Sequence, residues 1–390
     1  MFVSASPQYS YAPVLCFVGT SSLRLWSLTP AERLVRQFAR EGLTKTITPG
    51  EALSHSGPII FVRADAIIDQ PLIPALMKRP NLLLVGESTH GPARLAVHAH
   101  GEAASAILAM LADGHSPAAD LALSERSPGD LGADFWKALR KRETPYAYLL
   151  SNDNQQAVEW RMFMGTYKGA TDLVTKHLWP LPAFYATRHL ASLGVKPNMV
   201  TVTAAMLVFL AFWLFLNGHF GWGLAAAWLM TFLDTVDGKL ARSTLTSSKW
   251  GDVLDHGLDL IHPPFWYVAW GLGLAHAGFS WPPNLFWGVI GAILGGYILQ
   301  RVIEGIAIKW LGLEIHIWRP IDTLFRQVTA RRNPNLLILT LMTIFGRPDL
   351  GLIAVAVWTL ICLALHAVQL SQALAARRRG PLISWMATRP

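Results

Sequence analysis

Five aspartates lie in one stretch, FLDTVDGKLARSTLTSSKWGDVLDHGLDL, which runs from Phe232 to Leu260. Apolar runs flank the stretch on both sides, and every formal charge between Met199 and Gln300 falls between Asp234 and Asp259. Charged side chains at membrane depth are costly, so a cluster of them there indicates a functional site.

Four of these carboxylates fall on two predicted helix faces. Asp234 and Asp237 are three residues apart, and Asp255 and Asp259 are four apart, so the members of each pair share a face. Two short helices that meet across a turn would bring all four together, where their charges repel one another. One or two divalent cations remove this conflict, and hard oxygen ligands select Mg²⁺, Mn²⁺ or Ca²⁺. Because Mg²⁺ bridges carboxylates and substrate phosphates, the pattern points to phosphoryl transfer.

Small residues accompany the carboxylates. Gly238 and Ala241 fall on or near the face of the first pair, and Gly251 precedes Asp255 by one turn. These positions carry almost no side chain, so a bulky ligand could approach the helix backbone there. An ion transporter also uses acid pairs on membrane helices and is the alternative from another class. A transporter, however, has no need for such a gap beside the acids.

The complete spacing, D-x2-D-G-x2-A-R-x8-G-x3-D-x3-D from Asp234 to Asp259, resembles the signature of the CDP-alcohol phosphotransferase family. The segment KPNMVT, residues 196–201, which enters the first long apolar run, is also similar. The resemblance covers about residues 155–376. It implies that a phospho-alcohol group is transferred from a CDP-alcohol to an acceptor hydroxyl, with release of CMP, in the biosynthesis of phospholipids or other polar lipids.

The resemblance also implies roles for single residues. Asp234, Asp237 and Asp255 are expected to hold two Mg²⁺ or Mn²⁺ ions that grip the diphosphate. Asp259 is expected to complete the metal site and to act as general base, with His256 as the next candidate for the base. The CDP-alcohol site is expected to comprise Asp234, Asp237, Gly238, Ala241, Arg242 and Gly251.

The acceptor site is expected among basic residues. In the inositol-using branch of the family such residues form a pocket for the acceptor phosphate, and arginine is well suited to bind phosphate. Arg301 ends a charge-free apolar run and is the candidate here. The implied partners are a CDP-alcohol donor, a lipid or polyol acceptor of inositol type, the membrane and a second copy of the chain. No nucleic acid is expected.

Composition agrees with a membrane protein that carries a soluble part. Of the 390 residues, 52% are hydrophobic and only 15% are charged, against about 25% charged in soluble domains. The mean hydropathy is +0.33 and the pI is about 9.6. The net charge of +8 fits basic cytoplasmic loops that face anionic lipid. Cys16 and Cys362 lie far apart, so a disulfide framework is not expected.

The apolar content divides the chain into three expected parts. Residues 1–150 have the strand and helix alternation of a soluble α/β domain with a mostly parallel sheet. Residues 151–197 interleave basic and aromatic side chains, which favours an amphipathic segment at the membrane surface. Residues 198–380 are expected to form six transmembrane helices. Because basic residues concentrate in alternate connections, both termini are expected in the cytoplasm, at the inner (plasma) membrane of a bacterium or archaeon.

The N-terminal part contains local signals that can be assigned. The run VLCFVG, residues 14–19, predicts a buried strand. Thr29 as N-cap, Pro30 at the first helical position and Glu32 two residues later predict a capped helix that stops at Gly42. Further strands are predicted at 58–68 and 81–86, and further helices at 102–114 and 133–142.

The same part resembles the start of sugar-nucleotidyltransferase domains. That resemblance assigns Gly19 and Arg24 to a nucleotide-binding turn and Asp65 to a metal site. The order of domains resembles the bifunctional inositol-1-phosphate cytidylyltransferase/di-myo-inositol-phosphate phosphate synthases. The turn GTSSLR has fewer glycines than that family's, and PAER replaces its Pro-Lys. Two interpretations therefore stay open: a degenerate, regulatory or binding domain, or an active enzyme that makes the CDP-alcohol from CTP.

Overall fold

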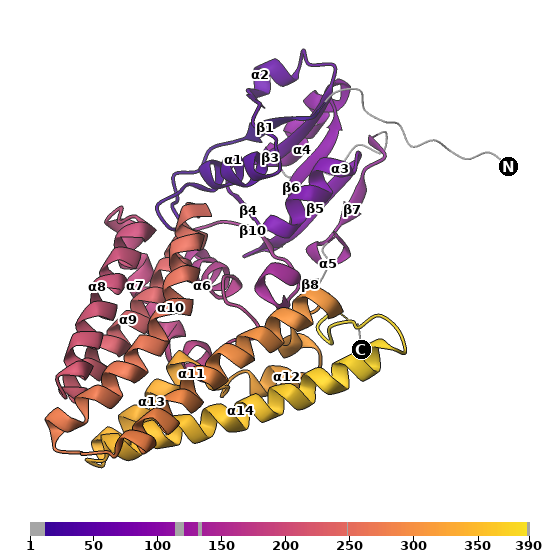
Figure 1. Cartoon of the computed structure of the whole chain (residues 1–390). Helices are drawn as coiled ribbons and strands as arrows, with labels where there is room; N and C mark the ends of the chain where they lie inside the picture. Colours follow the sequence, from indigo (N-terminus) through magenta and orange to yellow (C-terminus); the bar gives the residue numbers. More distant parts are fainter. Residues whose placement is uncertain (1–11, 114–120, 132–134, 248, 388–390) are drawn as a thin grey trace. The chain divides into compact units, whose positions relative to one another are not determined.

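The computed structural model describes residues 12–113, 121–131, 135–247 and 249–387, apart from the side chains of 138, 249, 250 and 252–256. The chain divides into two compact units (Figure 1). Unit 1 comprises Met1–Trp136 and Arg142–Gly165, and unit 2 comprises Lys137–Lys141 and Thr166–Pro390.

Unit 1 is built on one mixed β-sheet. Its strand order is β2-β1-β3-β6-β5-β10-β4, and β7 pairs with β5. β6 runs antiparallel to both β3 and β5, and β4 runs antiparallel to β10, so the expectation of a mostly parallel sheet needs correction. The strands are β1 (Val14–Val18), β2 (Thr46–Ile47), β3 (Pro58–Arg63), β4 (Ala66–Ile68), β5 (Leu82–Ser88), β6 (Gly91–His100), β7 (Ser124–Arg126) and β10 (Ala147–Leu149).

Helices cover both faces of this sheet (Figure 1). Successive residues of a strand point to opposite faces, and in β1 Leu15 packs with Leu34 of α1 whereas Cys16 packs with Ile107 of α4. The helices of unit 1 are α1 (Pro30–Arg40), α2 (Pro49–Ala52), α3 (Ile73–Lys78), α4 (Ala104–Asp113), α5 (Pro128–Leu131) and α6 (Gln155–Gly165).

The local signals of unit 1 are largely confirmed. The predicted strand at 14–19 is β1, and α1 begins at Pro30 with the capping box of Thr29 and Glu32 present. The strand expected at 58–68 is two strands, β3 and β4, with a turn between them. The helix expected at 133–142 is wrong for the described residues 135–142. They form the short strands β8 (Phe135–Trp136) and β9 (Lys141–Arg142) with a single 3₁₀ turn, Lys137–Leu139, between them. Arg140 has a φ of 49°, which lies outside the right-handed α-helical region.

Unit 2 is helical. Its hydrophobic core contains residues from several helices, including Phe215, Trp266 and Trp270. Gly273 lets two helices touch, because a Cβ there would lie 1.8 Å from the carbonyl oxygen of Phe215. The helices are α7 (Pro180–Ser192), α8 (Pro197–Leu216), α9 (Phe220–Ser243), α10 (Lys249–Gly273), α11 (Pro283–Ile306), α12 (Pro320–Phe325), α13 (Arg332–Ile344) and α14 (Pro348–Arg377).

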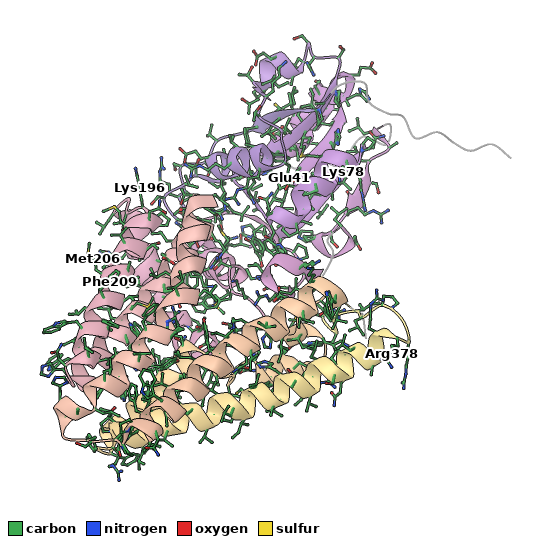
Figure 2. All side chains as sticks on the ribbon, in the orientation of Figure 1. Glu41, Lys78, Lys196, Met206, Phe209 and Arg378 are labelled. Atoms are coloured by element: carbon green, nitrogen blue, oxygen red, sulfur yellow. The ribbon has the colours of Figure 1, made fainter. Side chains whose placement is uncertain are left out.

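Unit 2 has the helices of a membrane protein. Among the described residues, three helical segments are long and apolar enough to cross a membrane: Pro197–Leu216, Pro283–Leu311 and Pro348–Arg377. Figure 2 labels Met206 and Phe209, large apolar side chains of α8 that are 66% and 71% exposed, as lipid-facing residues are. Six spans are not confirmed. Helix α13, for example, has 13 residues and is about 20 Å long, shorter than the hydrocarbon core of a bilayer.

The segment expected at the membrane surface contains α7 and the π-helical turn Val174–Leu178 before it. Leu178, Leu181 and Tyr185 are more than half exposed, whereas Phe184 is buried. Trp179 packs edge-on against Phe232 of α9, with ring centroids 5.2 Å apart. The exposed apolar side chains suit a surface helix, and that location stays a prediction.

Candidate functional site

The aspartate motif lies on two consecutive helices of unit 2. Asp234 and Asp237 lie in the C-terminal part of α9, and Asp259 lies in α10. The Asp237 side chain is buried, whereas the Asp259 side chain is 44% exposed. Asp255, in α10, has a side chain outside the described part of the chain, as does His256.

A single arginine joins the two helices. The guanidinium of Arg332, at the start of α13, donates to Asp234 Oδ2 at 2.6 Å and also to Asp259 Oδ1. The two carboxylates therefore converge on one positive charge, although they come from different helices. The Arg332 side chain is only 14% exposed, so water screens this contact weakly.

Asp237 lies close enough to Asp234 and Asp259 for their charges to interact. Its Oδ2 accepts a hydrogen bond from the hydroxyl of Thr201, on α8, at 2.6 Å. Its Oδ1 is buried and has no hydrogen-bond partner in the described structure. A buried carboxylate oxygen without a partner is costly, and a bound cation would satisfy it. The donor set of three converging carboxylates thus fits a hard divalent cation such as Mg²⁺ or Mn²⁺.

A pocket of about 440 Å³ opens beside these acids. Of the predicted residues, Asp234, Gly238, Arg242, Asp259 and Arg301 line it, whereas Asp237, Ala241 and Gly251 are not among its described lining residues. Gly238 lies against Arg242, since a Cβ at Gly238 would sit 2.9 Å from a guanidinium nitrogen of that arginine. Glycine at position 238 therefore leaves room for the side chain of Arg242, another residue of the motif.

The pocket is strongly cationic. Eight of its described lining residues are Arg or Lys, against three Asp. Such an excess of positive charge attracts and binds anions such as phosphate groups. The basic residues are Arg140, Lys168, Lys239, Arg242, Arg301, Arg326, Arg331 and Arg332.

Several of these residues were not in the predicted site. Lys239 lies between motif positions, and its Nζ sits 3.2 Å from the ring centroid of the buried Tyr167. Arg332 is 73 residues beyond Asp259, and Asp172 reaches the site through a hydrogen bond from Asn333 at 3.0 Å. Lys239 lies inside the motif, so its position was visible in the sequence. Only the packing of distant segments brings Arg332 and Asp172 to the site.

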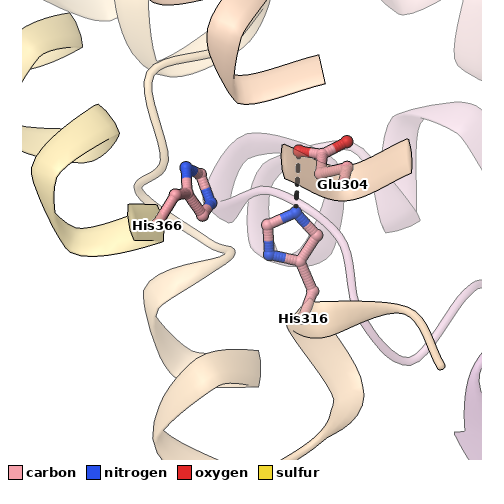
Figure 3. Close-up of side chains that lie close together, drawn as sticks. All are labelled: Glu304, His316 and His366. Carbon is pink, nitrogen blue, oxygen red and sulfur yellow. Dashed lines mark hydrogen bonds and ion pairs between the residues drawn. The ribbon is translucent and has the colours of Figure 1, made fainter. Parts of the chain in front are cut away.

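A second group with metal-ligand side chains lies in unit 2. One ligand atom from each of Glu304, His316 and His366 lies within 4.8 Å of the others (Figure 3). They come from α11, from the 3₁₀ turn Ile315–Ile317 and from α14. Both histidines are buried. Figure 3 also shows the hydrogen bond between Glu304 and His316, whose atoms are 3.0 Å apart.

The predicted nucleotide-site residues of unit 1 have ordinary structural partners. Gly19 has a φ of 78°, which suits a turn after β1. Arg24 is exposed and donates to the carbonyl of Ser27 at 2.8 Å. Both carboxylate oxygens of Asp65 accept from Arg63, at 2.9 and 2.8 Å.

Side chains of the segment after β1 are also buried. Leu25 and Trp26 are buried, and the Trp26 ring stacks on Phe163 of α6 at 5.7 Å. The side chains of this segment therefore belong to the packing of unit 1.

Comparison with known proteins finds similarity over part of the helical unit. Residues 195–330 match the family model described as CDP-alcohol phosphatidyltransferase. A phosphatidylinositol phosphate synthase of Streptomyces avermitilis is 37% identical over 100 residues, which are 24% of this chain and 37% of that protein. A phosphatidylinositol phosphate synthase of Mycobacteroides abscessus is 35% identical over 97 residues, 24% of this chain and 40% of that protein. The matched region thus spans about two fifths of the length of these curated relatives.

Proposed function

Since residues 195–330 form a CDP-alcohol phosphatidyltransferase domain, we propose that this membrane protein transfers a phospho-alcohol group from a CDP-alcohol to an acceptor hydroxyl. The observation that carries the proposal is that Asp234 and Asp259 converge on the guanidinium of Arg332 beside a cationic pocket. Converging carboxylates that can bind a cation, next to several arginines that can bind phosphate, suit a substrate with a diphosphate.

The chemistry divides among the residues of the site. The acceptor oxygen forms a bond to the phosphorus that carries the alcohol, and the bond from that phosphorus to the oxygen of CMP breaks. CMP leaves with the electron pair. Asp259 takes the proton of the acceptor hydroxyl as general base. Bound Mg²⁺ or Mn²⁺ would neutralise charge on the diphosphate, with Asp234, Asp237 and Asp255 as its ligands.

Other residues bind and orient the donor. Gly238 and Ala241 leave space for the nucleotide, with Gly251 on the facing helix. Arg242 lines the pocket and is placed to bind a diphosphate oxygen. These assignments predict that donor binding depends on α9 more than on any other helix.

The acceptor is proposed to be an inositol that carries a phosphate, with a CDP-diacylglycerol as donor. The relatives named above are phosphatidylinositol phosphate synthases, which supports this choice. Arg301 is the proposed contact to the acceptor phosphate, because it lines the pocket and carries a fixed positive charge.

In the test, purified full-length protein is incubated with CDP-diacylglycerol as donor. The acceptor is myo-inositol 1-phosphate, myo-inositol or glycerol 3-phosphate. Release of CMP and mass spectrometry of the lipid product identify the reaction and the acceptor. EDTA should abolish turnover, and Mg²⁺ or Mn²⁺ should restore it. Ion flux through the protein in vesicles, without CMP release from any donor, would favour the transporter instead.

Unit 1 is proposed to bind or regulate rather than to make the CDP-alcohol. The ion pair of Asp65 with Arg63 supports this, because both carboxylate oxygens already have a partner. Incubation of the full chain with CTP and myo-inositol 1-phosphate should release no pyrophosphate. Pyrophosphate release that Asp65→Ala removes would make the protein bifunctional.

A further inference from the structure

Glu304 joins two arginines of the pocket wall. Its Oε2 lies 3.0 Å from Arg301 Nη1, and its Oε1 lies 2.5 Å from Arg331 Nη2. Both arginines line the pocket, whereas Glu304 is not among the described lining residues. One carboxylate thus holds two guanidiniums, one with each oxygen, while the guanidiniums themselves border the space for ligand.

His316 holds Glu304 in turn. Its Nε2 lies 3.0 Å from Glu304 Oε1. Burial lowers the pKa of His316 to about 3, so the ring is neutral at physiological pH. Because an ionised carboxylate only accepts, a hydrogen bond to Glu304 requires the ring proton on Nε2. The hydroxyl of Thr323 donates to the His316 backbone carbonyl at 2.8 Å, and the His366 ring packs edge-on at 5.2 Å. The support of Glu304 is therefore itself fixed on two sides.

Glu304, His316 and His366 also have the ligand types of a zinc site. The fully buried His366 has no hydrogen-bond partner for either ring nitrogen in the described structure, a feature that a metal would explain. The neighbouring charges, however, argue against a metal ion at this cluster. Arg331 Nη2 already lies 2.5 Å from Glu304 Oε1 and 3.2 Å from His316 Nε2.

A divalent ion at that point would face positive charges from Arg301 and Arg331, with a single carboxylate to offset them. Repulsion between charges a few ångströms apart is strong when water is partly excluded. The guanidinium of Arg331 is therefore the cation of this cluster.

We propose that Glu304, held by His316, is a positioning residue. It fixes the guanidiniums of Arg301 and Arg331 side by side, so that together they bind the phosphate group of the acceptor. This inference rests on the proposed function, because it assigns the wall to the acceptor rather than to the donor. Without the carboxylate between them, the two guanidiniums repel each other, and their long side chains spread over many rotamers.

Removal of the Glu304 charge has two opposite consequences. It makes the pocket more positive, which favours any anion through the long-range field. It also releases the two guanidiniums from the geometry that binds one phosphate. If Glu304 only neutralises charge, phosphate binds more tightly to the variant; if Glu304 positions the arginines, phosphate binds more weakly.

The kinetic test compares Glu304→Gln with the wild-type full-length protein, using CDP-diacylglycerol and myo-inositol 1-phosphate. We expect the acceptor KM to rise about 10-fold and the donor KM to stay within twofold, because misplaced groups weaken only the ligand they hold. Asp349→Asn is the matched control. It removes a charge that pairs with Arg347 at 2.7 Å, and neither residue is among the described pocket lining. A lower acceptor KM, or an equal rise in both constants, would overturn the inference.

A binding measurement makes the inference independent of turnover. Calorimetry with inorganic phosphate should show about 10-fold weaker binding to Glu304→Gln than to wild type. His316→Phe, which keeps a ring but removes the hydrogen bond, should weaken binding in the same direction and serves if Glu304→Gln fails to fold. Wild-type protein that catalyses transfer without binding phosphate would overturn the inference alone. Phosphate binding that depends on Glu304, without transfer from any donor, would overturn the proposed function alone.

Metal analysis completes the test. We expect no stoichiometric zinc in protein purified without chelator, and no change in metal content with His366→Ala. One zinc per chain that this substitution removes would overturn the inference, because the cation of the cluster would then be a metal.

Discussion

At the scale of single residues, the adjacent arginines Arg331 and Arg332 bind acids at two different places. Arg332 donates to Asp234 and Asp259, whereas Arg331 donates to Glu304. Both contacts thus depend on two neighbouring residues where α13 begins. In the proposed reaction, donor and acceptor sites share this one short piece of backbone.

The base and the metal ligands can be separated by isosteric substitution. Asp259→Asn keeps the shape of the side chain and removes its basicity, and general base catalysis contributes about 10²–10⁴-fold in rate. We expect turnover to fall by that factor while CDP-alcohol binding, measured by calorimetry, stays within a few-fold of wild type. Asp237→Asn should lose both. If Asp259→Asn loses binding as completely as Asp237→Asn, Asp259 is mainly a metal ligand and His256 becomes the candidate base.

Arg332 and a divalent metal should compete for the same carboxylates. Arg332→Gln leaves Asp234 and Asp259 without their shared cation, so we expect a loss of about 1–3 kcal/mol of stability in EDTA. Mg²⁺ should then raise the thermal unfolding temperature of the variant more than that of wild type, because no guanidinium must leave. Arg347→Gln removes a different ion pair and should show no such recovery. Equal Mg²⁺ shifts in all three proteins would contradict competition between Arg332 and a metal at these acids.

At the scale of elements, α1 is defined by its own first turn. The hydroxyl of Thr29 accepts from the Glu32 amide at 3.2 Å, and the Glu32 carboxylate accepts from the Thr29 amide at 2.8 Å. The contacts that define this helix start are therefore local, which explains why the sequence predicted it correctly.

Loss of this cap should loosen α1 without affecting the membrane site. Thr29→Ala removes a hydrogen bond worth about 1 kcal/mol, so amides in the first turns of α1 should exchange with solvent about fivefold faster. Hydrogen exchange read by mass spectrometry measures this. Thr48→Ala removes the equivalent capping box of α2, a helix of only four residues, and leaves α1 exchange unchanged. A lower rate of CMP release with Thr29→Ala would show that unit 1 controls the membrane domain.

At the scale of the whole molecule, the helices of unit 2 determine which connections share a side of the membrane. Three helical segments qualify as spans by length and composition among the described residues. The basic connections between α9 and α10 and between α11 and α13 should face the cytoplasm, and the turns near His219, Ser280 and Pro348 should face outward.

Cysteine labelling tests this orientation. A membrane-impermeant maleimide applied to intact cells should label Ser280→Cys and leave Ser247→Cys unlabelled, since both positions are exposed in the structure. The native Cys16 and Cys362 are buried, so background labelling should be low. Permeabilised cells provide the control, in which Ser247→Cys should react. Labelling of Ser247→Cys from outside would reverse the proposed topology.

The sequence alone determined the features that depend on near neighbours. The spacing from Asp234 to Asp259 pointed to the family whose model residues 195–330 match. Residues three or four apart share a helix face, so such a pattern is visible in the sequence. Capping residues predicted where α1 begins, and the apolar runs predicted the helices of unit 2. The helix expected at 133–142 was wrong for the described residues 135–142. There Arg140 pairs with Glu314 and the carbonyl of Leu139 accepts from the amide of Gly169, contacts that the local sequence does not reveal.

Only the tertiary structure decided which charges meet. Arg332 reaches Asp234 across 98 residues of sequence, and Arg331 reaches Glu304 across 27. An arginine in a basic connection has the same sequence signature whether it faces anionic lipid or a buried carboxylate. The difference lies in packing: the start of α13 lies against α9, α10 and α11, and the partly buried acids there require positive partners because unpaired charges away from water are costly.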